Sequence, residues 1–188
     1  MPADNVIPVR LEAFSDGVIA IIITIMVLEL KVPHGPEPAA LLEQWPLFFA
    51  YALSFLQVGI YWINHHHLFK TAKHISPAIL WWNLLLLFAL SLVPFATAYM
   101  GENYFAVFPT AVYACAMLLP ALSFERLHQV LIGTHESDAA VSRGALKKGH
   151  IALALYAAAI PLAYVSPWIS LALIIAVAAM YFMPIRYF

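Results

Sequence analysis

The sequence predicts an all-α membrane protein with six transmembrane helices per subunit. Of its 188 residues, 64% are hydrophobic and only 10% are charged, so a water-soluble fold could not bury enough of the apolar surface. Six apolar stretches have about the 20 residues that a helix needs to cross a hydrocarbon core. They cover residues 10–31, 45–69, 77–100, 104–124, 146–165 and 167–185.

The first stretch has basic residues at both ends that fit the two membrane interfaces. Arg10 and Lys31 would lie about 32 Å apart along an α-helix, which is close to the thickness of the hydrocarbon core. The second and third stretches, 45–69 and 77–100, are each long enough for one crossing. Pro94 in the third predicts a kink, because proline is tolerated in membrane helices.

Proline also falls inside the fourth stretch, 104–124, at Pro109 and Pro120. We expect kinks at both positions and again at Pro161 in the fifth stretch. Only Ser166 separates the fifth stretch from the sixth. These last two helices are therefore expected to form a tight hairpin.

Basic residues indicate which ends of the helices face the cytoplasm. If the N-terminus is inside, only Lys31 of the nine lysines and arginines lies outside, as the positive-inside rule requires. Both termini are then cytoplasmic. The inner residues are Arg10, Lys70, Lys73, Arg126, Arg143, Lys147, Lys148 and Arg186.

The pattern leaves no room for a separate soluble domain. Residues 1–188 are predicted to form one transmembrane domain, since the largest inner segment, 125–149, is too short for a catalytic domain. Neither a glycine-rich phosphate loop nor a catalytic triad can be made out, which argues against an enzyme. The net charge of −1, with no basic face, argues against nucleic acid as a partner.

The first helix carries an acidic residue deep enough to need a partner. Asp16 would lie about 9 Å inward from Arg10, and an ionisable group at that depth faces protein or water, because exposure to lipid is costly. At 100° per residue, Asp16 points about 120° away from a line of residues on the same helix. That line consists of Arg10, Gly17, Ile21, Thr24 and Leu28.

This line of residues has two interpretations. It could face a central axis, with Asp16 turned back into its own subunit to hold the helix in place. Alternatively, the aliphatic residues pack against neighbouring helices, Thr24 hydrogen-bonds its own backbone, and Asp16 is a structural residue at a helix end.

A second polar cluster lies where the second helix ends and the third begins, at a depth similar to that of Asp16. Its amide and imidazole groups could join the carboxylate in one buried hydrogen-bonded network, although His66 and His67 could instead lie among lipid headgroups. Three consecutive histidines point in three directions, so no structural metal site is expected. The cluster comprises Trp62, Asn64, His65, His66, His67, Trp82 and Asn83. Gln57, seven residues before Asn64, shares its helix face.

The start of the first helix resembles a known family. Residues 10–16 read Arg-Leu-Glu-Ala-Phe-Ser-Asp, which is similar to the Arg-x-x-x-Phe-Ser-Asp signature of the transmembrane protein 175 family, potassium channels of lysosomes and bacteria. The resemblance continues through residues 17–30, through the Trp-Ile-Asn-His-His-His-Leu-Phe run at 62–69, and through Asn83-Leu84 and Val93-Pro94. It covers the first three helices, about half of the chain.

The resemblance implies a homotetramer in a bacterial plasma membrane, with the first helix of each subunit lining a central potassium pore. Ile21 would form a narrow hydrophobic constriction or gate, Thr24 a hydroxyl layer and Leu28 a second apolar layer, with Gly17 on the same line. The implied partners are K⁺, further copies of the chain and the lipid bilayer, with no cofactor beyond the permeant ion. An inner supporting network would comprise Arg10, Phe14, Ser15, Asp16, Trp62, His65 and Asn83.

Selectivity in such a pore would be unusual, because the sequence lacks a Thr-Val-Gly-Tyr-Gly carbonyl filter. A constriction that strips water, aided by Thr24 oxygens, would have to replace it.

Two other functions remain open. One is a small proton-coupled transporter that uses Asp16 and His65 as a relay. The other is a membrane enzyme whose histidines bind iron or zinc.

Overall fold

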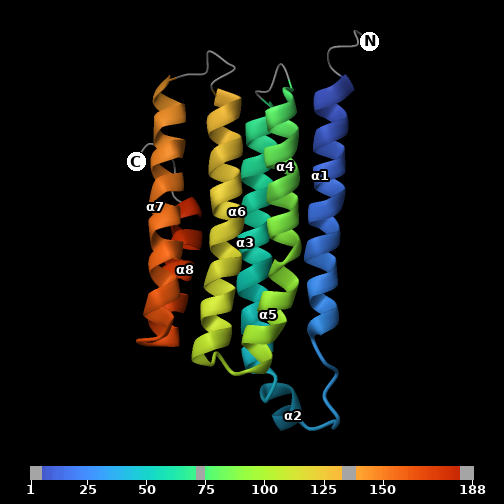
Figure 1. Cartoon of the computed structure of the whole chain (residues 1–188). Coiled ribbons are helices and arrows are strands. Elements are labelled where there is room, and N and C mark those ends of the chain that lie inside the picture. Colours follow the sequence, from blue (N-terminus) through green and yellow to red (C-terminus); the bar gives the residue numbers. More distant parts are fainter. Residues whose placement is uncertain (1–5, 71–74, 133–138, 183–188) are drawn as a thin grey trace.

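Every regular element in the described part of the chain is a helix, which confirms the all-α prediction (Figure 1). The computed structural model describes residues 6–70, 75–132 and 139–182. The elements are α1 (Val6–Ile25), the 3₁₀ helix η2 (Met26–Glu29), α2 (Pro38–Leu42), α3 (Trp45–Lys70), α4 (Pro77–Ser91), α5 (Val93–Glu102), α6 (Val107–Ile132), α7 (Ala139–Ala163) and α8 (Pro167–Phe182).

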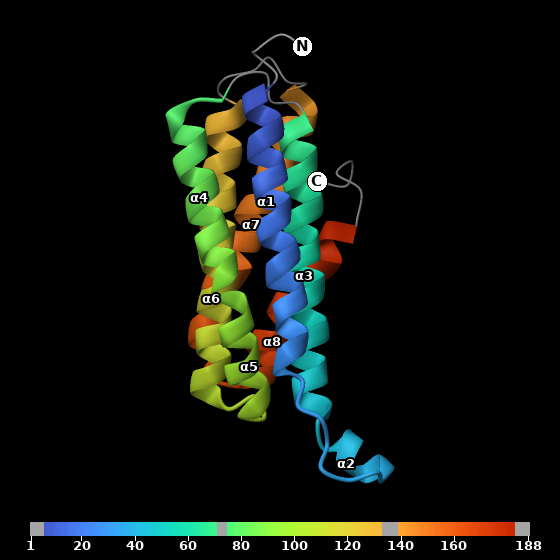
Figure 2. The same cartoon turned by 90° about the vertical axis from the view of Figure 1, so that its right-hand side faces the viewer.

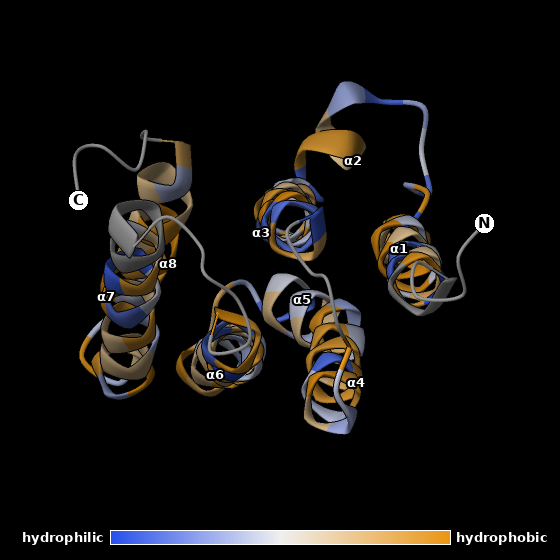
Figure 3. Cartoon of the chain, turned by 90° about the horizontal axis from the view of Figure 1, so that it is seen from above, coloured by the Kyte–Doolittle hydropathy of each residue, from blue (hydrophilic) through white to orange (hydrophobic). Residues whose placement is uncertain are grey.

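The long helices run side by side, and α1 lies at one edge of the bundle (Figures 1 and 2). Seen along the bundle axis, α7 and α8 occupy the opposite edge (Figure 3). Helix α1 packs against α3, α4 and α5, whereas α6 forms the main contact with α7. One side of α1 is therefore left uncovered by its own chain.

Local sequence signals explain where α4 begins and ends. Ser76 caps its N-terminus by accepting a hydrogen bond from the Ile79 amide at 3.4 Å, and Pro77 occupies the first turn, where its missing N–H costs nothing. Pro94 then separates α4 from α5, because it cannot donate to the preceding turn. The kink expected at Pro94 is thus an interruption within one apolar span, Pro77–Glu102.

Two helices extend beyond the expected apolar stretches. Helix α6 was expected at 104–124 but runs Val107–Ile132, and α7 was expected to begin at residue 146 but begins at Ala139. Hydropathy marks the part of a helix that lies in hydrocarbon, whereas polar residues can continue the same helix into water. At the other end of α6, Tyr104 and Phe105 have φ values of 50° and 56°. Because these two residues form a left-handed turn, the helix begins only at Val107.

Within the described residues, four helical spans are long and apolar enough to cross a membrane: Val9–Glu29, Trp45–Lys70, Pro77–Glu102 and Val107–Ile132. Six crossings therefore remain a prediction. Helix α8 is apolar but has only 16 residues, about 24 Å of helix. Helix α7 includes the cations Lys147 and Lys148. These spans indicate an integral membrane protein.

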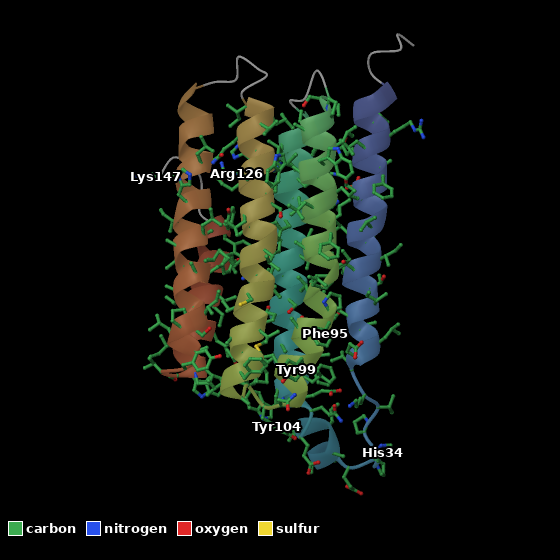
Figure 4. The ribbon with its side chains drawn as sticks, viewed as in Figure 1. His34, Phe95, Tyr99, Tyr104, Arg126 and Lys147 are labelled. Atoms are coloured by element: carbon green, nitrogen blue, oxygen red, sulfur yellow. The ribbon has the colours of Figure 1, made fainter. Side chains whose placement is uncertain are left out.

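Charged residues distinguish the two ends of the bundle. Arg126 and Lys147 lie toward the end where α1 begins, and His34 lies at the other end (Figure 4). Lys70 ends α3 at the first of these ends, while Lys31 follows η2 at the second. Of the basic residues used to predict orientation, Lys73 and Arg186 lie outside the described residues.

The close approach of α3 and α5 depends on a glycine. A Cβ atom at Gly101 would lie 2.8 Å from Leu47 Cδ1, 3.0 Å from Leu47 Cα and 3.2 Å from Ala50 Cβ. A methyl group there cannot fit unless the two helices move apart. Gly59, on α3, has no such neighbour within 4 Å.

We expect Gly101→Ala to lower the free energy of unfolding by about 1–3 kcal/mol, the usual cost of overpacking a well-filled site. Thermal unfolding of the purified protein in detergent measures the change. Gly59→Ala is the matched control and should be neutral or slightly stabilising, because alanine favours helix and meets no neighbour. Equal melting temperatures for the two variants would contradict this account of the α3–α5 contact.

Candidate functional site

Helix α1 has one buried face and one uncovered face. Ser15, Ile19, Ile22 and Met26 are all at most 2% exposed and pack toward the bundle. The residues predicted to line a central axis lie on the other side. Among these, the Ile21 side chain is 60% exposed and that of Leu28 is 78% exposed, and Gly17 and Thr24 are exposed as well.

The Thr24 hydroxyl is bonded to its own helix, as the structural alternative expected. Its Oγ1 donates to the Ala20 carbonyl at 2.9 Å and lies 3.0 Å from that of Ile21. Because the hydroxyl proton points to the backbone, the oxygen lone pairs remain free to accept from the uncovered side. This geometry suits a cation or water next to Thr24.

Leu28 departs from the ideal α-helical line. It belongs to η2, which as a 3₁₀ helix turns through about 120° per residue rather than 100°. Leu28 therefore lies further round the axis than helical periodicity predicted, although it stays on an exposed part of the helix. Gly17 and Ile21 lie within the regular part of α1.

Asn83 joins three helices toward the end of the bundle where α1 begins. Its Nδ2 donates to Ser15 Oγ at 2.9 Å, and Ser15 Oγ in turn donates to the Leu11 carbonyl. Its Oδ1 lies 2.8 Å from His65 Nε2, and because an amide oxygen can only accept, Nε2 carries the proton. All three side chains are at most 1% exposed, so this network links α1, α3 and α4 without solvent.

Two further contacts fasten α1 to α3. Trp62 Nε1 donates to Asp16 Oδ1 at 2.9 Å, so Asp16 turns back into its own subunit, as one of the two interpretations expected. His66 Nδ1 lies 2.8 Å from Glu12 Oε1. The Glu12–His66 pair was not predicted from the sequence, although both residues lie one turn from Asp16 and Trp62 on facing helices, a spacing that could have indicated it.

Arg10 and Phe14 do not join this group in the single chain. The Phe14 side chain is 56% exposed and that of Arg10 is also exposed, so both face away from the buried network. Their assignment to the network rested on the family resemblance alone. The structure brings together Ser15, Asp16, Trp62, His65 and Asn83 in one subunit.

An exposed ion pair lies just beyond α1 and η2, at the opposite end from the Asn83 network. Lys31 Nζ pairs with Glu102, at the end of α5, and this contact gives Lys31 a partner that its sequence position did not indicate. The hydrogen bond and the negative charge of Glu102 raise the pKa of the Lys31 ammonium above its ordinary value. Because the pair is exposed, its contribution to stability is small.

Gln57 and Asn64 lie on the same side of α3 and line one cavity, as their spacing predicted. Asn64 was also expected in a common cluster with Asp16, but this side of the helix lies away from the Asp16 network. Gln57 Nε2 donates to the Ile174 carbonyl on α8, and Tyr156 on α7 donates to Gln57 Oε1, both at 2.9 Å. Gln57 and Tyr156 line this cavity of about 20 Å³, which also borders Glu125. This volume is roughly the space of one water molecule. This side of α3 faces α7 and α8 rather than α1.

Within the described residues, no group of three His, Cys, Asp or Glu side chains is arranged to hold a metal ion. The consecutive histidines diverge instead. His65 bonds Asn83, His66 bonds Glu12, and His67 is exposed. The part of the chain that the structure describes therefore provides a hydrogen-bonded scaffold around the N-terminal half of α1.

Comparisons with known proteins agree on one relationship. The family model described as the endosomal/lysosomal potassium channel TMEM175 matches residues 10–94. The chain is 44% identical over 177 residues to a potassium channel of Chryseobacterium sp. (strain P1-3), covering 93% of this chain and 92% of that protein. It is 39% identical over 176 residues to a potassium channel of Streptomyces collinus, covering 87% and 85%.

The fold is also similar to a solved structure. The crystal structure of a lysosomal potassium-selective channel TMEM175 homologue from Chamaesiphon minutus superposes with a TM-score of 0.83. The two sequences are 34% identical, and the alignment covers 93% of this chain and 95% of that one.

We expect Asn83→Ala to lower the free energy of unfolding by about 1–3 kcal/mol, because it leaves the buried His65 N–H without an acceptor and removes the link to Ser15. Thermal unfolding in detergent measures this loss. Asn103→Ala is the control, since the exposed Asn103 donates only to its own helix, at the Tyr99 carbonyl, and its loss should cost less than about 0.5 kcal/mol. Similar destabilisation by both variants would contradict the role assigned to Asn83.

Proposed function

This chain belongs to the TMEM175 family of channels, and we propose that it conducts potassium ions through a central pore formed by four copies of the chain. The relatives named potassium channels and the solved potassium-selective homologue support K⁺ as the permeant ion. No cofactor is part of this proposal. The remaining question is which surface of the chain the ions pass.

One observation carries the pore assignment. The face of α1 that includes Gly17, Ile21 and Thr24 is uncovered by its own subunit, while the opposite face is buried and hydrogen-bonded to α3 and α4. A helix fixed on one side and free on the other, at the edge of the bundle, is suited to meet its symmetry copies around an axis. Gly17, with open space around its Cα, allows such copies to approach closely.

The uncovered face supplies an ordered series of ion contacts. Ile21 forms a hydrophobic constriction that strips water from the ion and closes the pore by dewetting. Thr24, about one turn outward, offers hydroxyl oxygens whose protons are already engaged by the backbone, so they replace part of the hydration shell. Leu28 forms a second apolar layer. In this proposal, selectivity comes from partial dehydration of the ion rather than from a cage of carbonyl oxygens.

The inner network sets the position of the pore-lining helix. Ser15 and Asp16 hold α1 against Asn83 and Trp62, with His65 supporting Asn83. We propose that Arg10 and Phe14, which face away from their own subunit, complete this network against a neighbouring copy. Gating then requires α1 to move relative to these anchors.

The proposed topology has six crossings, with α7 and α8 as an outer hairpin that completes the bundle. The turn between these helices is closed by the Ser166 amide donating to the Leu162 carbonyl at 2.9 Å, which supports an antiparallel pair. Both termini are cytoplasmic in this proposal, because the basic end of the bundle is the end where α1 begins. The membrane is a bacterial plasma membrane.

The alternative function, a proton-coupled transporter, agrees less well with the geometry than a channel does. Asp16 is bonded to Trp62 and His65 to Asn83, so the two titratable groups belong to separate hydrogen-bonded pairs. Neither Trp62 nor Asn83 can relay a proton at neutral pH. Discrete single-channel currents would contradict a carrier, whereas slow saturable exchange would contradict a channel.

Planar bilayer recordings with a K⁺/Na⁺ gradient test the pore face. We expect Thr24→Ala and Ile21→Asn each to lower the ratio of potassium to sodium permeability several-fold, because the first removes a ligand oxygen and the second hydrates the constriction. Ser91→Ala is the control for Thr24, since Ser91 makes the same kind of bond to its own helix on α4. Ile175→Asn on α8 is the control for Ile21. Unchanged selectivity and conductance in both α1 variants would defeat this pore face.

Cysteine accessibility tests the tetramer geometry independently. In a Cys115→Ser background, which removes the exposed native thiol, Ile21→Cys and Thr24→Cys should react with water-soluble thiol reagents. The same positions should also form disulfide-linked dimers, because the copies converge on one axis. Ile175→Cys should do neither. Unreactive thiols with no cross-linking would place α1 away from any water-filled axis.

A further inference from the structure

A groove of about 260 Å³ lies on the lateral face of the bundle between α4 and α6. Almost all of its lining is apolar, and the polar exceptions are a serine and an arginine. None of these residues belongs to the pore face of α1 or to the inner network. The groove is lined by Trp82, Leu85, Phe88, Ala89, Leu119, Leu122, Ser123 and Arg126.

The polar end of the groove lies toward the cytoplasm. Helix α4 begins at the inner side and α6 ends there, so Trp82, early in α4, and Arg126, late in α6, lie at a similar depth. Ala89 and Leu119 are each seven residues away from these, about 10 Å deeper into the membrane. A tryptophan and an arginine at the membrane interface, followed by an apolar channel, match the layering of one lipid leaflet.

The charge of Arg126 is available to a ligand. Its Nη1 donates at 3.2 Å to Gln129 Oε1, which is a neutral amide oxygen. The neighbouring carboxylate, Glu125, is buried against the other side of α6, where it accepts from Gln129 Nε2 at 3.0 Å and lies 3.2 Å from His150 Nε2. The guanidinium therefore keeps most of its five donors for an anion at the mouth of the groove.

We propose that this groove binds an anionic phospholipid of the cytoplasmic leaflet. The phosphate is held by the Arg126 guanidinium, whose planar fork fits phosphate oxygens. One acyl chain lies along Leu85, Phe88 and Leu122. The inference rests on the membrane placement of the chain and not on ion conduction, so it fails or survives separately from the pore assignment.

Native mass spectrometry of the purified protein tests the proposal, with dioleoyl phosphatidylglycerol and dioleoyl phosphatidylcholine added in equal amounts. The wild type should retain phosphatidylglycerol preferentially. Arg126→Gln should weaken that binding about tenfold, as loss of a charge-assisted contact predicts, and leave phosphatidylcholine unchanged. Lys147→Gln removes the same charge from α7 at the same end of the bundle (Figure 4) and should have no such effect.

A second variant tests the groove itself. Leu122→Trp fills the apolar channel without removing charge, because Leu122 is a half-exposed lining residue, and it should reduce binding of phosphatidylglycerol by a similar factor. Ile175→Trp on α8 is its control. Equal phosphatidylglycerol binding by wild type and Arg126→Gln would overturn the proposal. So would cross-linking of Leu122→Cys between copies of the chain, since a neighbouring subunit would then fill the groove.

Discussion

Inside a membrane a polar side chain has no water to bond with, and this constraint determines how α1 is held. Its N-terminal half carries a carboxylate at residue 16, a hydroxyl at residue 15 and a second carboxylate at residue 12. Each of these groups accepts a hydrogen bond from a side chain on α3 or α4. Single hydrogen bonds of this kind contribute only about 0.6–2 kcal/mol each in membrane proteins, but three of them on one face fix both the rotation and the depth of the helix.

Fixing one face leaves the other face free for a different task. Ile19, Ile22 and Met26 continue the buried side outward by apolar packing alone, so the uncovered side carries no structural obligation within the subunit. Its residues are therefore free of packing requirements from their own subunit. Thr24 illustrates the separation, because its proton is used for the helix backbone while its oxygen stays available. The same hydroxyl is thus both a satisfied donor and a free acceptor.

Periodicity predicted what depends on a regular helix and failed where tertiary contacts or irregular backbone decide. The two faces of α1 and the inward turn of Asp16 follow from 100° per residue, and the structure has both. Leu28 deviates because η2 changes the angular step. Asn64 was grouped with Asp16 because of its depth, yet it lies on the side of α3 where Gln57 bonds Tyr156 and Ile174. A sequence gives depth and face for one helix, but not which neighbour covers each face.

Helix α4 connects the inner network to the lateral surface. Asn83 on α4 bonds Ser15 of α1, and its neighbour in sequence, Trp82, lines the groove against α6. Consecutive residues on a helix point about 100° apart, so these two necessarily face different partners. Both contacts lie in the first two turns of α4, which is a continuous helix capped by Ser76 and interrupted only beyond Ser91. Because one helical segment carries both contacts, a displacement of α4 at the groove would also change its contact with α1. The surface that meets the bilayer and the helix assigned to the pore are therefore separated by the width of a single helix.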